Sequence, residues 1–192
     1  MLPPEPSPVD VWTVSLDGET HGTLLSAEER ERAAKFHFER DRVRWIGARS
    51  ALRSILSQYV KMAPVDLRFT YGVHGKPALE QAAIHFNISH SNALAMIAVT
   101  YTAPVGIDIE RIRADVDIAK LLLRIGESAA GTTAELFQTW ARREAKTKAV
   151  GGPLMEIPLG DLRVIDLKAP AGHAAALALA GKDPRVLYRT FH

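Results

Sequence analysis

The order of apolar and polar positions predicts a chain in which helices and strands are mixed. Strands are expected where apolar residues alternate with polar ones or form short runs, and helices where they recur every three or four positions. Helices are expected from the capping box Ser26–Glu29, and over Arg40–Val60, Ile118–Ile125 and Ala134–Val150. The expected strands are Val9–Leu16, Leu67–Tyr71, Ile84–Ile88, Leu94–Tyr101, Val105–Glu110, Leu162–Leu167, Ala174–Ala180 and Val186–Phe191.

This order contains a strand–helix–strands pattern twice, which predicts the α+β class. Residues 1–8 are proline-rich and are expected to form a flexible N-terminal segment. A boundary between two halves is expected near residues 102–104. The sequence therefore predicts an N-terminal half over 9–104 and a C-terminal half over 105–192.

The composition excludes several classes of protein. The 192 residues include no cysteine, so a disulfide framework and a thiolate metal site are excluded, and a bound metal would be a hard cation with oxygen or imidazole ligands. The first residues do not resemble a secretory signal and no apolar run is long enough to span a bilayer, so a cytoplasmic protein without membrane contact is expected. Residues 26–61 hold nine Lys or Arg against five Asp or Glu. This excess favours an anionic partner, although a solvated arginine-rich helix face is equally compatible with it.

Two carboxylates stand out in the strand expected over 105–110. Alternate side chains of a strand share a face, so Asp108 and Glu110 should project together while Ile107 and Ile109 point into the core. Neighbouring carboxylates repel unless a cation lies between them, and Mg²⁺ prefers such oxygen ligands. The alternative is an edge strand with a solvated polar face, in which Glu110 pairs with a nearby arginine.

A second candidate group lies on the helix expected over 134–150. Trp140, Glu144 and Lys148 are spaced four residues apart and form one stripe along the helix. The tryptophan favours a partly buried stripe, whereas an exposed Glu–Lys pair is the alternative.

Two polar segments between strands are expected to be turns. In the segment 89–92, Ser89 and Asn92 are ordinary turn residues, and His90 could donate a hydrogen bond to a phosphate. The Gly75–Pro77 turn (Gly-Lys-Pro) is not a Walker A loop, because its spacing is too short and proline replaces the Ser or Thr. Lys76 could still face a phosphate.

The order of these segments resembles a known family. Gly-Lys-Pro at 75–77, Phe-Asn-Ile-Ser-His-Ser at 86–91, Gly-Ile-Asp-Ile-Glu at 106–110 and Trp-x-x-Arg-Glu-Ala-x-x-Lys at 140–148 together resemble the 4′-phosphopantetheinyl transferase superfamily. The match is to its longer type, which has two halves and activates synthetases and carrier proteins. The resemblance implies two similar halves with a pseudo-twofold relation, each a small, largely antiparallel sheet packed with helices, and one site at their interface.

The resemblance also implies a reaction and residue roles. Such enzymes move the 4′-phosphopantetheine arm of coenzyme A onto a serine of an acyl or peptidyl carrier protein and release adenosine 3′,5′-bisphosphate. The carriers belong to fatty acid, polyketide or nonribosomal peptide biosynthesis. Mg²⁺, with Mn²⁺ as the alternative, would be held by Asp108, Glu110 and Glu144. Glu144 would accept the serine proton, directly or through a water molecule, and Lys148 would stabilise the leaving phosphate. The residues expected to contact coenzyme A are Arg44, Lys76, Ser89, His90 and Lys148.

This chain departs from the family pattern in three places, one of which is the region after Leu154, which is short and carries no recognisable motif. Arg143 stands where the family usually has a lysine, which retains the charge but changes its geometry. The Phe-Ser-x-x-Glu stretch is not found between Arg113 and Phe137, so the role of residues 114–136 in carrier docking is open.

Two other functions remain open at this point. A Mg²⁺-dependent hydrolase of the coenzyme A pyrophosphate would use the same carboxylates, with water in place of the carrier serine. A nucleic-acid-binding module could use the arginine-rich helix, although the chain carries no recognisable motif for reading nucleic acid, so no nucleic-acid partner is expected. Because both halves lie in one chain, a monomer is expected.

Overall fold

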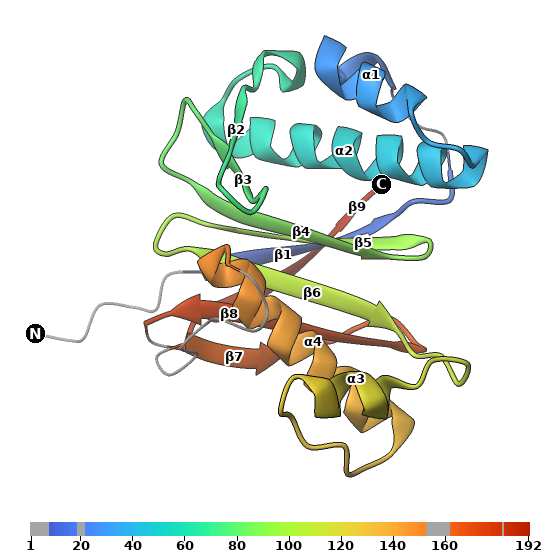
Figure 1. Cartoon of the computed structure of the whole chain (residues 1–192). Helices are drawn as coiled ribbons and strands as arrows, with labels where there is room; N and C mark the ends of the chain where they lie inside the picture. Colours follow the sequence, from blue (N-terminus) through green and yellow to red (C-terminus); the bar gives the residue numbers. More distant parts are fainter. Residues whose placement is uncertain (1–7, 19–21, 153–161, 182) are drawn as a thin grey trace, which may run out of the picture.

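A computed structural model of the chain describes residues 8–18, 22–152, 162–181 and 183–192. Within these residues it is a mixed α+β structure with four α-helices and three small sheets. Two of the sheets lie face to face, and helices cover their outer faces (Figure 1).

The first sheet has the strand order β4-β5-β1-β9. Its strands are β1 (Pro8–Ser15), β4 (His85–Ser91), β5 (Leu94–Thr100) and β9 (Arg185–Phe191). All neighbours in this sheet are antiparallel except β1 and β9, which are parallel. The long helix α2 (Glu39–Val60) packs on one face through Leu52, Ile55 and Leu56, which are fully buried, and α1 (Ala27–Ala34) lies beside α2.

The second sheet has the order β6-β8-β7 and is antiparallel throughout. It consists of β6 (Val105–Arg111), β7 (Leu162–Asp166) and β8 (His173–Ala180). Helix α4 (Thr133–Val150) crosses its outer face, and α3 (Ile118–Arg124) packs against α4 (Figure 1). A small hairpin of β2 (Phe69–Tyr71) and β3 (Pro77–Leu79) completes the strands, and two short 3₁₀ helices cover Gly22–Leu24 and Pro64–Asp66.

The inner faces of the two sheets share a hydrophobic core. Alternate residues of β1 and β5 meet alternate residues of β6 and β8 there. The cluster contains Val9, Val11, Met96, Ala98, Val105, Ile107, Ile109, Ala175, Leu177 and Leu179. Since the odd-numbered residues of β6 fill this core, its even-numbered residues must face α4.

Most of the predicted elements are confirmed to within one or two residues. The capping box is present: the Ser26 hydroxyl accepts from Glu29 N–H at 3.2 Å, and the Glu29 carboxylate accepts from Ser26 N–H at 2.8 Å. Helix α4 ends at Gly151, whose φ of 69° is left-handed as expected for a helix stop. Residues 1–7 of the predicted flexible segment lie outside the described residues. Strand β3 was not predicted.

The prediction of a polar turn over 89–92 is wrong for its first three residues. Ser89, His90 and Ser91 belong to β4, and the turn consists of Asn92 and Ala93, with Asn92 at φ 57°. The segment looks like a turn in the sequence because its serines would be unfavourable in an apolar core. In the structure these serines meet hydrogen-bonding groups of β6 instead.

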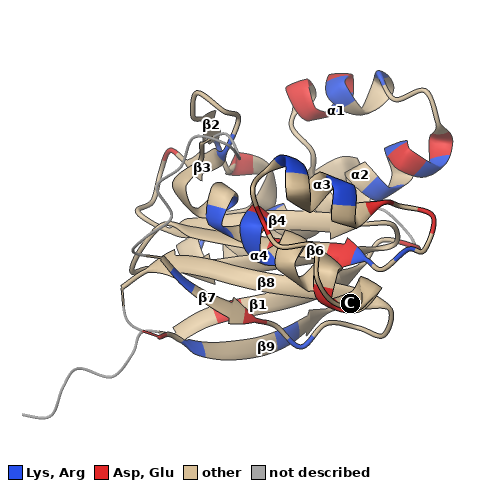
Figure 2. Ribbon diagram, turned by 60° about the horizontal axis from the view of Figure 1, so that its bottom comes forward, with Lys and Arg blue, Asp and Glu red and all other residues tan. Residues whose placement is uncertain are grey.

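No helix among the described residues is long and apolar enough to span a membrane. Charge gathers on helices and loops, whereas β5 and β8 carry no charged residue (Figure 2).

Candidate active site

Strand β6 presents its two carboxylates as the alternation predicts. Ile107 and Ile109 are buried in the core between the sheets, and Asp108 and Glu110 point the other way. Asp108 is only 2% exposed, so the alternative of a solvated edge strand is wrong at this position. Glu110, nearer the end of the strand, is half-buried.

Small residues bring α4 unusually close to β6. A Cβ atom on Gly106 would overlap backbone atoms of Ala145 and Ala149. Ala141, Ala145 and Ala149 line the buried face of α4. This close approach places the Glu144–Lys148 side of the helix beside the carboxylates of β6.

Lys148 is bonded to the most buried carboxylate. Its Nζ lies 2.5 Å from Asp108 Oδ1 and 3.0 Å from Ser89 Oγ. The second oxygen, Asp108 Oδ2, is buried and has no hydrogen-bond partner. An orphaned carboxylate oxygen in such a place is costly unless a cation or solvent reaches it.

The other two predicted ligands share this electrostatic environment. Burial raises the pKa of Glu110, and the neighbouring charge of Asp108 raises it further. Burial also raises the pKa of Glu144, with Lys148 acting in the opposite direction and Asp108 in the same direction. The three carboxylates are thus electrostatically coupled, and a cation would relieve their repulsion. Among the described residues, however, no group of three or more His, Asp or Glu side chains is arranged to hold a metal ion.

Ser89 and His90 point to opposite sides of β4. Ser89 faces β6 and is 6% exposed. His90 is exposed and lines a large groove on the α2 side of the sheet. Partial desolvation and the positive charge of Lys148 hold the pKa of His90 below its usual value.

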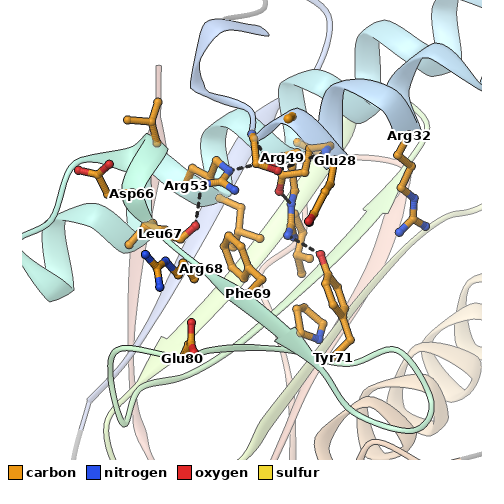
Figure 3. A pocket seen from close by; sticks show the side chains of 18 of the residues that line it. Glu28, Arg32, Arg49, Arg53, Asp66, Leu67, Arg68, Phe69, Tyr71 and Glu80 are labelled. Atoms are coloured by element: carbon orange, nitrogen blue, oxygen red, sulfur yellow. Dashed lines mark hydrogen bonds and ion pairs between the residues drawn. The ribbon is translucent and has the colours of Figure 1, made fainter.

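The groove has a volume of about 1260 Å³ and lies between α1, α2 and the β2–β3 hairpin (Figure 3). Its wall is charged and aromatic, with the arginines Arg32, Arg49, Arg53 and Arg68 beside the carboxylates Glu28, Glu29, Asp66 and Glu80. Arg53 is buried and bonded to Glu29 and to the carbonyl of Leu67, and Arg49 bonds to Tyr71 at 2.8 Å and lies over the ring of Phe69. The basic and aromatic side chains that line it are Arg32, Trp45, Arg49, Arg53, Arg68, Phe69, Tyr71 and His90.

Sequence reasoning missed this groove as a site. The local excess of positive charge was its only signal, and that excess was equally compatible with a solvated helix face. Arg53 is 2% exposed and ion-paired with Glu29, so this part of α2 is not such a face. Arg42, about three turns earlier on the same helix, lies nearer the surface and pairs with Glu39.

Two predicted coenzyme A contacts have other partners in the structure. Arg44 donates to Asp17 at 2.9 Å and to Asn92 at 2.7 Å, next to the β4–β5 turn. Lys76 Nζ donates to the carbonyls of Val105 at 3.0 Å and Ala149 at 2.8 Å. Lys76 lines a smaller cavity of about 470 Å³, while its neighbours Gly75 and Pro77 line the large groove.

Comparison with known proteins identifies the family. A family model described as the N-terminal part of 4′-phosphopantetheinyl transferase matches residues 12–102. The 4′-phosphopantetheinyl transferase HetI of Nostoc sp. is 33% identical over 168 residues, which are 78% of this chain and 71% of HetI. The 4′-phosphopantetheinyl transferase Sfp of Bacillus subtilis is 26% identical over 174 residues, which are 82% of this chain and 77% of Sfp. The chain therefore belongs to the 4′-phosphopantetheinyl transferase family, and its activity is that of a phosphopantetheinyl transferase.

Proposed function

We propose that the chain moves the 4′-phosphopantetheine arm of coenzyme A to a serine of an acyl or peptidyl carrier protein, with Mg²⁺ held by Asp108, Glu110 and Glu144. Mn²⁺ is the alternative ion. The observation that carries this proposal is the buried, unpartnered oxygen of Asp108, which lies among two further carboxylates and Lys148.

The donor chemistry of these residues suits a hard divalent cation. All three side chains offer carboxylate oxygens; burial first, and then the charge of Asp108, raise the pKa of Glu110 and Glu144, and a cation would relieve the second effect. When bound, Mg²⁺ would neutralise negative charge on the pyrophosphate. The protein itself would supply the positions of the reacting groups.

The large groove suits the nucleotide end of coenzyme A. Arg49 and Arg53 are paired with Glu29, whereas Arg32 and Arg68 could bind phosphate, and the exposed ring of Tyr71 could stack on a purine base. His90 lines the groove while the preceding residue, Ser89, contacts Asp108 on the other side of the strand. A ligand that lies in the groove and passes His90 would therefore bring its pyrophosphate to the carboxylates.

Arg44 is proposed to bind the 3′-phosphate in place of its present ion-pair partner, Asp17. It precedes Trp45, which lines the groove. Its ion pair with Asp17 is partly solvated, since the Asp17 side chain is 60% exposed, so replacing that carboxylate by a phosphate would cost about 1 kcal/mol or less.

Lys76 is proposed to support coenzyme A binding through the turn that contains it. If Lys76 Nζ bound a phosphate directly, it would have to give up its two hydrogen bonds to the carbonyls of Val105 and Ala149, so an indirect role is proposed. Gly75 and Pro77 already line the groove, and Lys76 ties this turn to the end of α4.

In the proposed reaction the carrier serine hydroxyl attacks the phosphorus that bears the pantetheine arm. A bond forms between the serine oxygen and this phosphorus, and the bond from phosphorus to the bridging oxygen of the pyrophosphate breaks. Glu144 takes the serine proton; its raised pKa suits this role, because a base with a very low pKa accepts a proton poorly. Lys148 stabilises the negative charge on the departing adenosine 3′,5′-bisphosphate.

The test combines coenzyme A, Mg²⁺ and several apo carrier proteins with the full chain, followed by intact-mass measurement. A gain of one phosphopantetheine arm on the carrier is expected. Release of adenosine 3′,5′-bisphosphate with an unmodified carrier would instead support the hydrolase. Asp108→Ala and Glu144→Ala should each abolish transfer, whereas the control Asp166→Ala, at a carboxylate paired with Arg142 on the surface, should not. Near-normal turnover of Asp108→Ala or Glu144→Ala would refute the site.

We further propose that residues 9–104 and 105–192 are halves related by a pseudo-twofold axis, with the site at their interface and with β9 of the second half crossing over to pair with β1 of the first. Support comes from the contact between β4 of the first half and β6 of the second, which carries Ser89 and Asp108. Because both sides come from one chain, we propose a monomer. Light scattering after gel filtration would show a mass near 21.0 kDa for a monomer.

A further inference from the structure

Strands β4 and β6 run side by side without belonging to one sheet. Three side chains of β4 replace the missing backbone ladder. Asn87 accepts from Ile107 N–H at 2.9 Å, Ser89 from Ile109 N–H at 3.3 Å, and Ser91 from Arg111 N–H at 2.9 Å. The seam between the two sheets is therefore made of side chain to backbone hydrogen bonds.

Each of the two serines of this seam also donates a hydrogen bond to a carboxylate of β6. Ser89 donates to Asp108 Oδ1 at 2.8 Å, and Ser91 donates to Glu110 Oε2 at 3.3 Å. Each serine thus holds one carboxylate and the backbone N–H of the residue that follows it. The two contacts are alike because side chains two residues apart on a strand point to the same face, so Ser91 meets Glu110 as Ser89 meets Asp108.

The bonding capacity of Ser89 is already used. A hydroxyl donates one hydrogen bond and accepts two. Ser89 donates to Asp108 and accepts from Ile109 N–H and from Lys148 Nζ. It is also buried, and it faces away from the groove that His90 lines. No capacity remains for a phosphate of coenzyme A.

From this geometry we infer that Ser89 and Ser91 are positioning residues that orient Asp108 and Glu110 for the metal, and that Ser89 does not contact coenzyme A. Each serine engages one oxygen of its carboxylate and leaves the other available. At Asp108 that other oxygen is the buried atom without a hydrogen-bond partner. The inference rests on the proposed metal site.

The test measures binding of Mn²⁺ alone to the full chain by electron paramagnetic resonance. Loss of a group that orients a metal ligand typically weakens metal binding by about 10- to 100-fold. Ser89→Ala and Ser91→Ala should each fall in this range. Ser57→Ala, which removes a helix hydroxyl that donates to the carbonyl of Ser54, should bind Mn²⁺ as the wild type does.

A second measurement separates positioning from substrate contact. Binding of adenosine 3′,5′-bisphosphate without metal should be unchanged in Ser89→Ala and Ser91→Ala. Ser89→Thr, which keeps the hydroxyl, should restore most of the Mn²⁺ affinity. If Ser89→Ala fails to fold, the half-buried Ser91→Ala and Ser89→Thr variants decide the question.

The outcomes distinguish this inference from the proposed function. Wild-type chain that binds no Mn²⁺ would overturn both. Unchanged Mn²⁺ affinity in the alanine variants of a wild type that does bind Mn²⁺ would overturn the serine roles alone. Weaker nucleotide binding with unchanged Mn²⁺ affinity would make Ser89 a substrate contact.

Discussion

At the scale of single residues, Asp108 determines the charge balance of the site. It is a carboxylate removed from water, and Lys148 is its ion-pair partner. A buried pair of this kind contributes little net stability, but removing one partner leaves a buried charge without compensation. The metal-free protein therefore depends on Lys148, and a bound cation would take over part of that role.

Lys148→Met should destabilise the metal-free protein by about 3 kcal/mol, at the lower end for a buried pair because the Lys148 side chain is 29% exposed. Added Mg²⁺ should raise the melting temperature of this variant more than that of the wild type, because the uncompensated carboxylate gains a cation. Thermal unfolding with and without Mg²⁺ measures both effects. Lys146→Met on the same helix is the control, and equal stability of the two variants would contradict the assignment.

Lys76 makes a pH-dependent contribution to stability. Burial lowers its pKa to about 8 in the folded protein, against roughly 10.4 in an unfolded chain. Between these values the unfolded state binds more protons, so the contribution of Lys76 to the free energy of unfolding rises with pH in this window.

Lys76→Met should therefore cost more stability at about pH 9.5 than at about pH 7, reaching about 1 to 3 kcal/mol as two bonds to carbonyls are lost. Urea unfolding at both pH values provides the measurement, with Lys120→Met at an exposed position as the control. A cost that does not change with pH would show that the amine titrates alike in both states.

At the scale of elements, the distance between α4 and β6 determines where Glu144 and Lys148 lie. Gly106 allows the helix to touch the strand, and the atoms that an added Cβ would meet belong to the backbone of Ala145 and Ala149. Backbone atoms of a helix cannot move individually. A larger residue must shift the whole helix away from Asp108.

Gly106→Ala should destabilise the fold by about 3 kcal/mol or more. It should also weaken Mn²⁺ binding, since Glu144 moves with the helix. Gly18→Ala is the control, because its added Cβ would have no heavy atom within 4 Å. Denaturant unfolding and Mn²⁺ titration test the prediction; wild-type stability in Gly106→Ala would mean that the helix can slide at little cost.

Elements were predictable from the sequence wherever periodicity decides the structure. The apolar face of α2 and the alternation of β6 depend on spacing alone, and both are confirmed. The end of β4 depends on the hydrogen-bonding groups of β6 that lie opposite its serines, and the spacing of residues along the sequence does not reveal these partners. The groove and the bond between Lys148 and Asp108 likewise arise from residues far apart in the chain, and only the folded structure brings them together.

At the scale of the whole molecule, Asp10 connects three distant parts of the chain. It accepts from Tyr59 of α2 at 2.6 Å and from Arg189 of β9 at 2.7 Å, and Tyr59 in turn accepts from Trp12 at 2.9 Å. Burial and the bond to Asp10 raise the pKa of Tyr59, so it stays a donor at all ordinary pH values. These contacts attach β9 to the first sheet, although it follows the second sheet in the chain.

Asp10→Ala should lower the free energy of unfolding by about 2 to 4 kcal/mol, because two hydrogen bonds to a charged group are lost and Tyr59 is left without its acceptor. Guanidinium unfolding measures the loss. Asp183→Ala removes an exposed carboxylate 3.7 Å from Arg163 and should change stability little. Equal effects of the two substitutions would mean that the Asp10 contacts do not hold β9.

The parallel pairing of β9 with β1 also has a consequence for synthesis. Asp10 and Arg189 are 179 positions apart, so β1 leaves the ribosome long before its outer neighbour exists. Until then one edge of β1 keeps its backbone groups open to other strands. Contacts between such distant segments form slowly, because a long loop must close before they are made. The first sheet is thus the first to begin and the last to be completed, and the nascent chain needs protection there until residues 185–191 arrive.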